Sequence, residues 1–342
     1  MNNFKKIGIS ALAGSLAMVS AHAVDYTMSG EIASTFTTQD NATGTEANNG
    51  KGFGTETDLT FTASGELDNG FTVDMLMGVD TAVALTNSSS QVTVGMGSLG
   101  TIRLNHIGGS SANAIDDVMP NAYQETWDGL SDGTDPSFFG SLTSSGSIEY
   151  RIPAQEYMGV TLNASLLYDP GSSEASNAPR GVGATSVSGT AYTVKLNHES
   201  GLELGGGYET VEDDGGQAGV MGATSNTTAY AKFSMGPLSV GVQESWNNAM
   251  HSNSVRGIDN SATFMGVAYT AGDVTVSYGE STLQVEALGN ASASSEEELD
   301  SVQVAYTMGA MTISGAMSET DNVGGTAGAT HEENTLAVSF AF

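Results

Sequence analysis

Apolar and polar residues alternate along most of the chain from residue 24 onward. One segment shows the alternation clearly, with apolar Leu59, Phe61 and Ala63 separated by polar Thr60 and Thr62. A repeat of two residues is typical of β-strands, because successive side chains of a strand point to opposite faces. The pattern predicts a chain built almost entirely of β-strands.

Short turns and longer polar connections separate the predicted strands in strict alternation. Seven short turns fall at Asp68–Gly70, Gly97–Gly100, Glu156–Gly159, Glu199–Gly201, Gly236–Pro237, Ala271–Asp273 and around Gly309. Eight longer connections lie near residues 38–54, 82–89, 107–146, 169–187, 212–225, 247–261, 281–297 and 319–331. This arrangement predicts sixteen antiparallel strands, with both ends of the chain on the short-turn side.

The two faces of the predicted strands differ in chemistry. One face is apolar, as in Val240 and Val242, and charge is nearly absent from it, with Glu244 as an exception near a long connection. The other face carries polar and charged side chains, namely Glu149, Arg151, Asn163, Lys195, Asn197, Glu203, Glu209, Lys232 and Gln303. An even number of strands of about ten residues, apolar on one face, is typical of a transmembrane β-barrel with lipid outside and a polar lumen. Closure also satisfies every strand edge in hydrocarbon. A soluble sandwich or solenoid, whose apolar faces pack together, is the alternative.

The connection at residues 107–146 is the longest, at about forty residues. Connections beyond roughly 12–15 residues are usually functional or disordered. This one contains the apolar and aromatic residues Met119, Tyr123, Trp127, Phe138 and Phe139. It also contains the acids Asp116, Asp117, Glu125, Asp128, Asp132 and Asp135. The aromatic residues predict that the connection folds against the rest of the protein, inside the barrel.

The first 23 residues are typical of a secretory signal peptide. Lys5 and Lys6 precede an apolar run from Ile7 to Val19, and Ala21–Ala23 resembles a cleavage site with small residues. The apolar run is too short to span a bilayer. We therefore expect residues 1–23 to be a signal peptide and residues 24–342 to form one barrel domain.

Charge and composition exclude several classes of partner. Residues 24–342 contain seven Lys and Arg residues against 39 Asp and Glu residues, a formal charge of −32. This charge argues against nucleic acid and against polybasic docking to anionic lipid, and it is compatible with a soluble acidic protein or with a surface that gathers cations. The chain has no cysteine, which excludes disulfides and thiolate metal sites.

Candidate catalytic and metal-binding motifs are weak. Gly95–Gly100 matches the G-x-G-x-x-G fingerprint, but a strand pattern follows where a dinucleotide site needs a helix, so we interpret it as a hairpin turn. The histidines His106, His198, His251 and His331 lack ligand spacing, and no Ser-His-Asp arrangement can be argued. We therefore predict that the protein is not an enzyme and needs no cofactor. Ca²⁺ binding by the acidic groups at residues 116–117, 212–214 and 296–298 stays open, although none has EF-hand spacing.

Three segments carry a resemblance to a known family. Residues 92–104 resemble a fourth-strand/fifth-strand hairpin that leads into a third loop, and Asp135–Gly140 resembles a Pro-Glu-Phe-Gly-Gly stretch of that loop. Phe342 matches a terminal aromatic residue that serves as an assembly signal. In this order and spacing, the chain resembles the general diffusion porins of the Gram-negative outer membrane, over essentially the whole of residues 24–342.

The resemblance implies a fold, a location and an activity. Short turns would face the periplasm, long loops would face the cell exterior, and the third loop would narrow the pore at mid-height. The protein would be a homotrimer in outer-membrane lipid. Each chain would form a water-filled channel for passive diffusion of small hydrophilic solutes and ions.

The chain departs from the family pattern at residues that affect selectivity. Thr60 and Gln91 stand where the family has wall arginines in its second and fourth strands, and Asn105-His106 replaces a Gly-Arg pair. The family's loop glutamate becomes Ser137, which leaves Asp132 and Asp135 as nearby acids.

We predict a pore constriction formed by loop acids and wall bases. The predicted constriction residues are Asp116, Asp117, Glu125, Asp132, Asp135, Arg103 and Arg151, and the predicted pore-lining residues are Lys195, Lys232, Thr60 and Gln91. If Arg103 and Arg151 face the loop acids, they create a transverse field across the throat. The other interpretation is that these bases keep the lumen soluble and form incidental ion pairs. Because bases are too few to offset the acids, we expect a preference for cations.

Two alternative functions remain at this point. The first is a secreted or surface-attached acidic β-protein that binds Ca²⁺ or a partner and conducts nothing. Phe342 and the uncharged apolar face argue against it. The second is a barrel specific for one solute, which needs a basic or aromatic ladder through the lumen. The sequence gives no sign of such a ladder.

Overall fold

A computed structural model describes most of the chain from Asp25 to Phe342. It covers residues 25–41, 50–80, 86–128, 136, 138–141, 143, 146–170, 188–212, 223–249, 259–285 and 295–342. The predicted signal peptide (1–23) lies outside the described residues, as do Asp132, Asp135 and Ser137. Within the described residues, no helix is both long enough and apolar enough to cross a bilayer.

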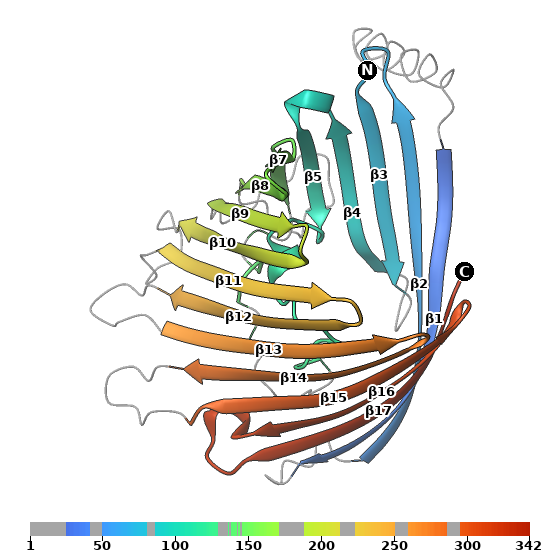
Figure 1. Cartoon of the computed structure of the whole chain (residues 1–342), viewed down its shortest axis with the longest axis vertical. Coiled ribbons are helices and arrows are strands. Elements are labelled where there is room, and N and C mark those ends of the chain that lie inside the picture. Colours follow the sequence, from blue (N-terminus) through green and yellow to red (C-terminus); the bar gives the residue numbers. More distant parts are fainter. Residues whose placement is uncertain are drawn as a thin grey trace, which may run out of the picture.

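The described residues form one antiparallel sheet with three short 3₁₀ turns, η2 (Gly97–Leu99), η3 (Asn113–Ile115) and η4 (Val323–Gly325) (Figure 1). The strands are β1 (Asp25–Asn41), β2 (Gly50–Glu66), β3 (Thr72–Asp80), β4 (Thr86–Gly95), β5 (Thr101–Ile107), β6 (Ser147–Arg151), β7 (Gln155–Tyr157), β8 (Val160–Asp169), β9 (Ser188–His198), β10 (Leu202–Glu212), β11 (Ala223–Met235), β12 (Leu238–Ala249), β13 (Asp259–Ala271), β14 (Val274–Val285), β15 (Glu297–Met308), β16 (Met311–Asp321) and β17 (Thr330–Ala341).

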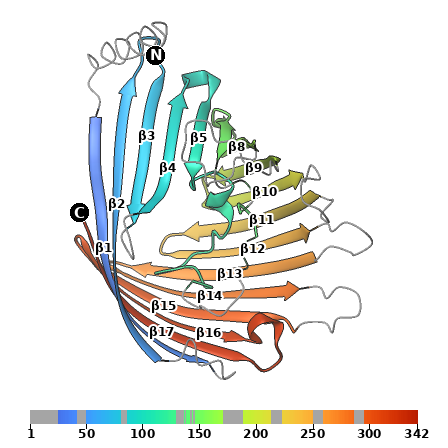
Figure 2. The ribbon, with the colours of Figure 1, turned by 180° about the vertical axis from the view of Figure 1, so that it is seen from behind.

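The sheet closes into a barrel of sixteen strand positions. β6 and β7 both pair with β8, one after the other, so they are two parts of a single interrupted strand. Pro153 lies in the interruption, and its missing N–H cannot join a ladder. β1 pairs with β2 on one side and with β17 on the other, so the sheet of described strands closes on itself (Figure 2). The predicted sixteen-stranded antiparallel barrel is confirmed.

The short turns lie where the sequence pattern puts them. In the turn between β7 and β8, Met158 and Gly159 both have positive φ, at 49° and 78°. A two-residue hairpin turn of type I′ requires this conformation at both central positions. Glycine adopts a positive φ without steric cost, whereas at Met158 the Cβ atom makes this backbone conformation strained.

The strands are longer than the sequence pattern indicates. β1 and β2 pair as far as Gln39 and Gly50, inside the segment 38–54 that we predicted to be a loop. β14 likewise continues to Val285, and β17 begins at Thr330. Ladder hydrogen bonds need no apolar side chains, so pairing continues where both faces are polar and the two-residue pattern fades.

Burial is inverted relative to a soluble domain. Val302 and Leu336 on the apolar face are 57% and 54% exposed, whereas Gln243 on the polar face is 1% exposed. A sandwich would bury the apolar face between its two sheets. The exposure therefore excludes the soluble sandwich and assigns the apolar face to lipid and the polar face to the lumen.

The outer face carries more charge than we predicted. Glu280, Asp300, Glu319 and Glu332 are direct cross-strand partners in series across β14, β15, β16 and β17. They share the outward register of Val302 and Leu336, so the prediction of a nearly uncharged apolar face, with Glu244 as an exception, was wrong. Glu319 lies in a segment predicted to be a loop, whereas Glu280, Asp300 and Glu332 lie in the predicted strands, at their long-loop ends and beyond the apolar part of the wall. We call these four residues the outer acidic row.

Candidate functional site

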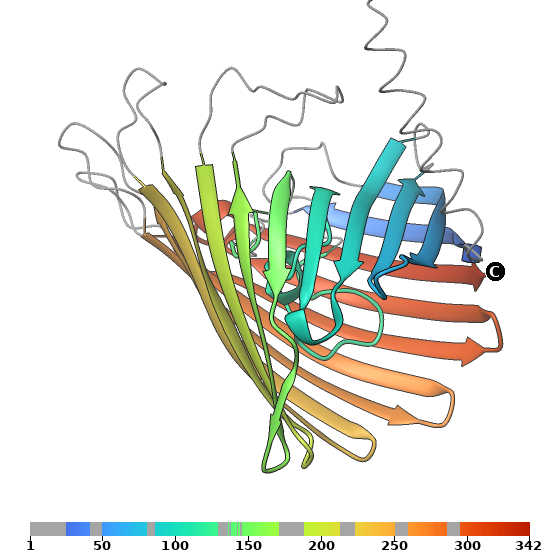
Figure 3. The same cartoon turned by 90° about the horizontal axis from the view of Figure 1, so that it is seen from above.

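The third long connection folds into the barrel, as predicted. It leaves β5 at Ile107, forms η3, and crosses the lumen side of the wall before it returns to β6 at Ser147 (Figure 3). Its backbone bonds to side chains of β12, β14 and β15, which lie far from β5 and β6 in the sheet order. We call the described residues of this connection, 108–128, 136, 138–141, 143 and 146, the inserted loop.

The hydrophobic core lies between the inserted loop and the wall. Ile115, Met119 and Phe139 of the loop belong to one buried cluster with wall residues such as Phe264 and Leu283. Full burial of a side chain of this size is worth about 1.5–3 kcal/mol. The aromatic residues of the connection therefore anchor it to the inner wall, as the sequence predicts.

Lumen-facing glycines make room for the inserted loop. A Cβ atom at Gly207 on β10 would lie 2.2 Å from Cζ of Phe139, and one at Gly279 on β14 would lie 2.1 Å from Oγ1 of Thr126. Real Cβ atoms do not approach other atoms so closely. Glycine in a strand often marks such a close approach, and here it fixes where the loop packs.

Two wall glutamines hold the loop backbone. The side-chain oxygen of Gln243 on β12 accepts the N–H of Val118 at 3.0 Å, and its amide nitrogen donates to two loop carbonyls at 2.7 and 3.0 Å. The oxygen of Gln303 on β15 accepts the N–H groups of Tyr123 and Gln124 at 2.9 and 3.1 Å, and its nitrogen donates to the Gln124 carbonyl at 2.7 Å. An amide has both donors and an acceptor, so one side chain satisfies several backbone groups. We expected Gln303 on the lumen face but assigned no role to either glutamine.

The returning part of the loop is held by a buried carboxylate. Glu209 on β10 is fully buried and accepts hydrogen bonds from the N–H of Gly140 (2.9 Å), the hydroxyl of Thr143 (3.0 Å) and the amide of Asn226 (2.8 Å). A buried charge is tolerated only when such donors surround it. The sequence places Glu209 on the polar face, but the donors come from segments that sequence position does not connect.

The described acids of the predicted constriction lie on the inserted loop. Asp116, Asp117 and Glu125 belong to its crossing segment, whereas Asp132 and Asp135 are outside the described residues. Burial, with smaller contributions from the charges of Asp116 and Asp128, raises the pKa of Asp117 to about 6. An oxygen of Asp117 accepts the N–H of Met119 at 2.7 Å, which opposes part of this rise.

Arg151 pairs with a wall acid in the structure. Its guanidinium contacts both carboxylate oxygens of Glu149, two residues away on β6, with NH2 at 3.1 Å from Oε2. The same oxygen accepts the amide of Asn105 at 3.3 Å and the N–H of Ser111 at 3.4 Å. Arg103 donates to the Gly109 carbonyl of the loop at 2.6 Å. A transverse field between these arginines and the loop acids stays a prediction.

Lys195 on β9 and Lys232 on β11 share one acid. Their Nζ atoms lie 3.0 and 3.6 Å from Oε1 of Glu203 on β10. Of the four described lumen bases, Arg103, Lys195 and Lys232 fall within three residues of the short-turn end of their strands, and Arg151 is the last residue of β6. The barrel thus gathers the bases in one part of the lumen wall, between β5 and β11.

The other predicted positions are also on the wall. Thr60 on β2 is paired with Ser29 and Gly78. Gln91 on β4 is 7% exposed, and its amide donates to the Gly108 carbonyl at 3.3 Å, so it holds the start of the inserted loop.

Phe342 extends the ladder beside β1. It exchanges two backbone hydrogen bonds with Gly30, both 2.9 Å long, and a Cβ atom at Gly30 would lie 2.7 Å from the Phe342 ring. The ring therefore covers a glycine on the outer face. Its role in assembly stays a prediction.

An acidic wall on β1–β3 is the main feature that sequence reasoning missed. Glu31, Asp58 and Asp80 are direct cross-strand partners, and Glu56 precedes Asp58 on the same face of β2. Carboxylate oxygens of Glu56, Asp58 and Asp80 lie within 4.8 Å of one another. The alternation of residues 56–60 indicates that Glu56 and Asp58 face the lumen. It does not give the strand register that places Glu31 and Asp80 beside Asp58. We call these four acids the lumen acidic wall.

The inserted loop comes close to this wall through Tyr123. Burial, followed by the negative charges of Glu333, Asp128, Glu31 and Glu56, raises the pKa of the Tyr123 phenol. Two of these four acids belong to the lumen acidic wall. The charges of this wall therefore act on Tyr123 of the inserted loop.

A closed barrel with an apolar exterior, a polar lumen and an inserted loop defines a channel-forming protein of a membrane. Comparison with protein families identifies the kind of channel. The family model described as Gram-negative porin matches residues 8–295. The chain belongs to this family. It is accordingly an outer-membrane channel for passive diffusion.

Solved porin structures share the fold at low sequence identity. The in-vitro folded trimer form of OmpT from Vibrio cholerae matches with a TM-score of 0.64 and 11% identity, over 94% of this chain and 100% of that one. The channel DcaP of Acinetobacter baumannii matches with 0.66 and 10%, over 94% and 98%. A further structure described as porin matches with 0.64 and 15%, over 93% and 100%. A search of curated proteins finds no match.

Proposed function

We propose that the channel prefers cations, and the lumen acidic wall carries this proposal. Glu31, Glu56, Asp58 and Asp80 cluster on three adjacent strands. In the described parts of β1–β4, Lys51 is the one Lys or Arg residue, and it shares the outward register of Phe53. The described lumen face of β1–β4 therefore carries these four acids and no Lys or Arg residue.

The lumen bases do little to offset this potential. Arg151 is paired with Glu149, and Lys195 and Lys232 share Glu203. A row of carboxylates in a narrow channel with low-dielectric walls concentrates cations and repels anions. Ions that pass along β1–β3 in the lumen meet this negative potential.

The zero-current potential in a KCl gradient tests the preference. Purified protein is inserted into a planar bilayer, with a higher salt concentration on one side. We expect the sign that corresponds to K⁺ permeating more readily than Cl⁻, and we expect the potential to shrink as ionic strength rises and screens the carboxylates. A sign corresponding to chloride selectivity would contradict the proposal.

We further propose that the protein assembles as a homotrimer. The support is the fold shared with the trimer form of OmpT, together with the rule that most oligomers of identical chains close with cyclic symmetry. Native mass spectrometry of detergent-solubilised protein should give the mass of three chains, which falls to that of one chain after boiling. A single-chain mass before heating would show that the trimer proposal is wrong.

A further inference from the structure

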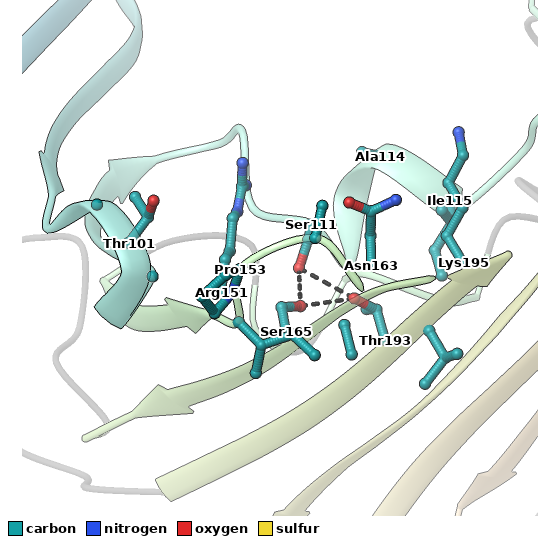
Figure 4. A pocket seen from close by; sticks show the side chains of 16 residues that line it. Thr101, Ser111, Ala114, Ile115, Arg151, Pro153, Asn163, Ser165, Thr193 and Lys195 are labelled. Carbon is teal, nitrogen blue, oxygen red and sulfur yellow. Dashed lines mark hydrogen bonds between the residues drawn. The ribbon is translucent and has the colours of Figure 1, made fainter. Parts of the chain in front are cut away.

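A cavity of about 390 Å³ lies in the lumen, between the start of the inserted loop and strands β6, β8 and β9 (Figure 4). Its lining includes Ser111 and Ile115 of the loop, together with Arg151, Asn163 and Lys195 of the wall. Ligand pockets are typically about 300–1,000 Å³. The cavity is therefore large enough for a small organic solute.

Three polar side chains stand side by side along this cavity. Asn163 and Lys195 are direct cross-strand partners on β8 and β9, and Arg151 is paired with Ser165 two residues further along β8. Figure 4 shows the polar ends of Arg151, Asn163 and Lys195 pointing to the same side. Two cations and an amide donor thus line one side of the cavity in a row.

Neither base uses all of its N–H donors on its acidic partner. A guanidinium has five N–H donors, and Arg151 uses its Nε and NH2 groups to contact Glu149. An ammonium has three N–H donors, and Lys195 has one carboxylate, that of Glu203, at 3.0 Å. The side chains of Arg151 and Lys195 remain 35% and 42% exposed. Both can donate to a solute that enters the cavity.

The described lumen bases gather on the wall around this cavity although the whole chain is strongly negative. The four described lumen bases stand against the two acids that pair with them, Glu149 and Glu203. The next acid on this wall, Glu209, is buried beneath the returning loop and bonded to Gly140 and Thr143. With a formal charge of −30 overall, the protein has concentrated cationic groups beside this cavity.

The remainder of the lining decides what kind of anion fits. Hydroxyls of Ser111, Ser165 and Thr193 form a hydrogen-bonded cluster, with 2.5 Å between Ser165 and Thr193 and 3.3 Å between Thr193 and Ser111. Beside them lie the apolar groups of Ile115 and Pro153. A solute with one anionic end and a short apolar tail satisfies both parts of the lining, whereas an inorganic anion leaves the apolar part unfilled.

We propose that this cavity binds small organic monocarboxylates, held through the carboxylate by Arg151 and Lys195 with Asn163 between them. Hydrogen bonds between charged partners are about twice as strong as neutral ones, and a guanidinium matches the geometry of a carboxylate. The proposal rests on the channel function only in that a solute reaches the cavity through the lumen. It gives a cation-preferring channel a separate site for one class of anion.

Isothermal titration calorimetry on detergent-solubilised protein tests the site without requiring conduction. Butyrate is the probe, and butyramide, which has the same shape and no charge, is the control ligand. We expect butyrate to bind and butyramide not to bind. Equal binding of the two ligands, or binding of neither, would overturn the proposal, even if the same protein conducts normally in a bilayer.

Matched variants locate the site. Lys195→Gln and Lys232→Gln remove the same charge from the same acid, Glu203, but only Lys195 lines the cavity. We expect Lys195→Gln to weaken butyrate binding about tenfold, as the loss of a charged hydrogen bond implies, and Lys232→Gln to weaken it less than about threefold. Equal losses in both variants would mean that butyrate responds to the general lumen potential, and the assigned site would be wrong.

A neutral change provides an independent check. Ala114 of η3 is exposed and lines the cavity, so Ala114→Leu fills part of the volume without altering any charge. We expect butyrate binding to fall by at least about tenfold, because the apolar tail loses its place, while the zero-current potential in KCl keeps its wild-type value. Undiminished butyrate binding in Ala114→Leu would contradict the proposed position.

Discussion

At the scale of single residues, Asp117 shows how the inserted loop changes the chemistry of its own acids. Its carboxyl is placed among buried loop atoms, and the pKa rises from the ordinary 3.8 to about 6. A raised carboxyl pKa means that the folded protein holds the proton between about pH 4 and pH 6 while the unfolded chain has lost it. The contribution of Asp117 to folding stability therefore falls as pH rises through this window and is constant above it.

The same titration makes the channel sensitive to pH. As Asp117 ionises near pH 6, the inserted loop gains a negative charge, so we expect cation selectivity to increase between about pH 5 and pH 7. Most exposed carboxyls have pKa values near 4 and contribute little change there. Zero-current potentials recorded across this range should show the step in the wild type.

Asp117→Asn is the matched variant for this prediction. It keeps the oxygen that accepts the Met119 N–H and removes the titrating proton. The step near pH 6 should vanish while the channel still conducts. If Asp117→Asn retains the step, another group is responsible for it.

The sequence predicted correctly which face of the sheet a charged side chain lies on, but it did not predict which residue that side chain pairs with. The alternation correctly put Glu149, Lys195 and Glu203 on the lumen face. It gave no information that Arg151 pairs along its own strand or that Lys195 and Lys232 share Glu203 from two different strands. Partners depend on register and on side-chain reach, neither of which a two-residue repeat specifies.

At the scale of elements, the inserted loop and the strands beneath it are fitted to each other. Gly207 and Gly279 provide space, while Gln243 and Gln303 provide hydrogen bonds. The sequence predicted that the connection enters the barrel, because its aromatic residues need a partner surface. It could not predict the path, since isolated glycines and glutamines in strands carry no signal of what packs on them.

The fit between Phe139 and Gly207 can be tested by adding one methyl group. Gly207→Ala puts a carbon 2.2 Å from the Phe139 ring, so the ring must move and the loop must loosen. We expect altered single-channel conductance with more open-channel noise, and an overpacking cost of about 1–3 kcal/mol. Single-channel recordings in a planar bilayer measure this effect.

Gly315→Ala on β16 is the control for that experiment. A Cβ atom there would meet its nearest neighbours at 3.6 and 3.7 Å, which is ordinary contact, and Gly315 is paired with the outward-facing Val304 and Leu336. Its conductance should match the wild type. Identical conductance and noise in Gly207→Ala would show that Phe139 does not fix the loop at this position.

The strand lengths show a second limit at this scale. The turns on the short side were predicted correctly because each has a compact glycine-containing signal. On the long-loop side, β1 and β2 continue through residues that are polar on both faces. The two-residue pattern is visible only where the strands face lipid and carry apolar side chains. The sequence analysis therefore underestimated the lengths of the strands beyond that zone.

At the scale of the whole molecule, charge is divided around the barrel. The lumen acidic wall lies on β1–β3, the lumen bases lie between β5 and β11, and the outer acidic row lies on the outside of β14–β17. Composition predicted the negative excess but not this division, because strands that are distant in sequence contribute to each cluster. The fold was predictable because the two-residue repeat runs through the entire barrel. The electrostatics of the pore depend on how sixteen registers combine.

The division of charge yields two triple variants that change the net charge equally. Glu31→Gln, Asp58→Asn and Asp80→Asn together neutralise three acids of the lumen acidic wall. Asp300→Asn, Glu319→Gln and Glu332→Gln together neutralise three acids of the outer acidic row. If ions pass along the acidic lumen, only the first set affects the potential that they meet.

The zero-current potential in a KCl gradient, measured for the wild type and both triple variants, tests this account most directly. We predict that the lumen triple variant loses most of the cation preference while the outer triple variant keeps the wild-type value. Equal potentials in the lumen triple variant and the wild type, or a larger change in the outer triple variant, would contradict the account.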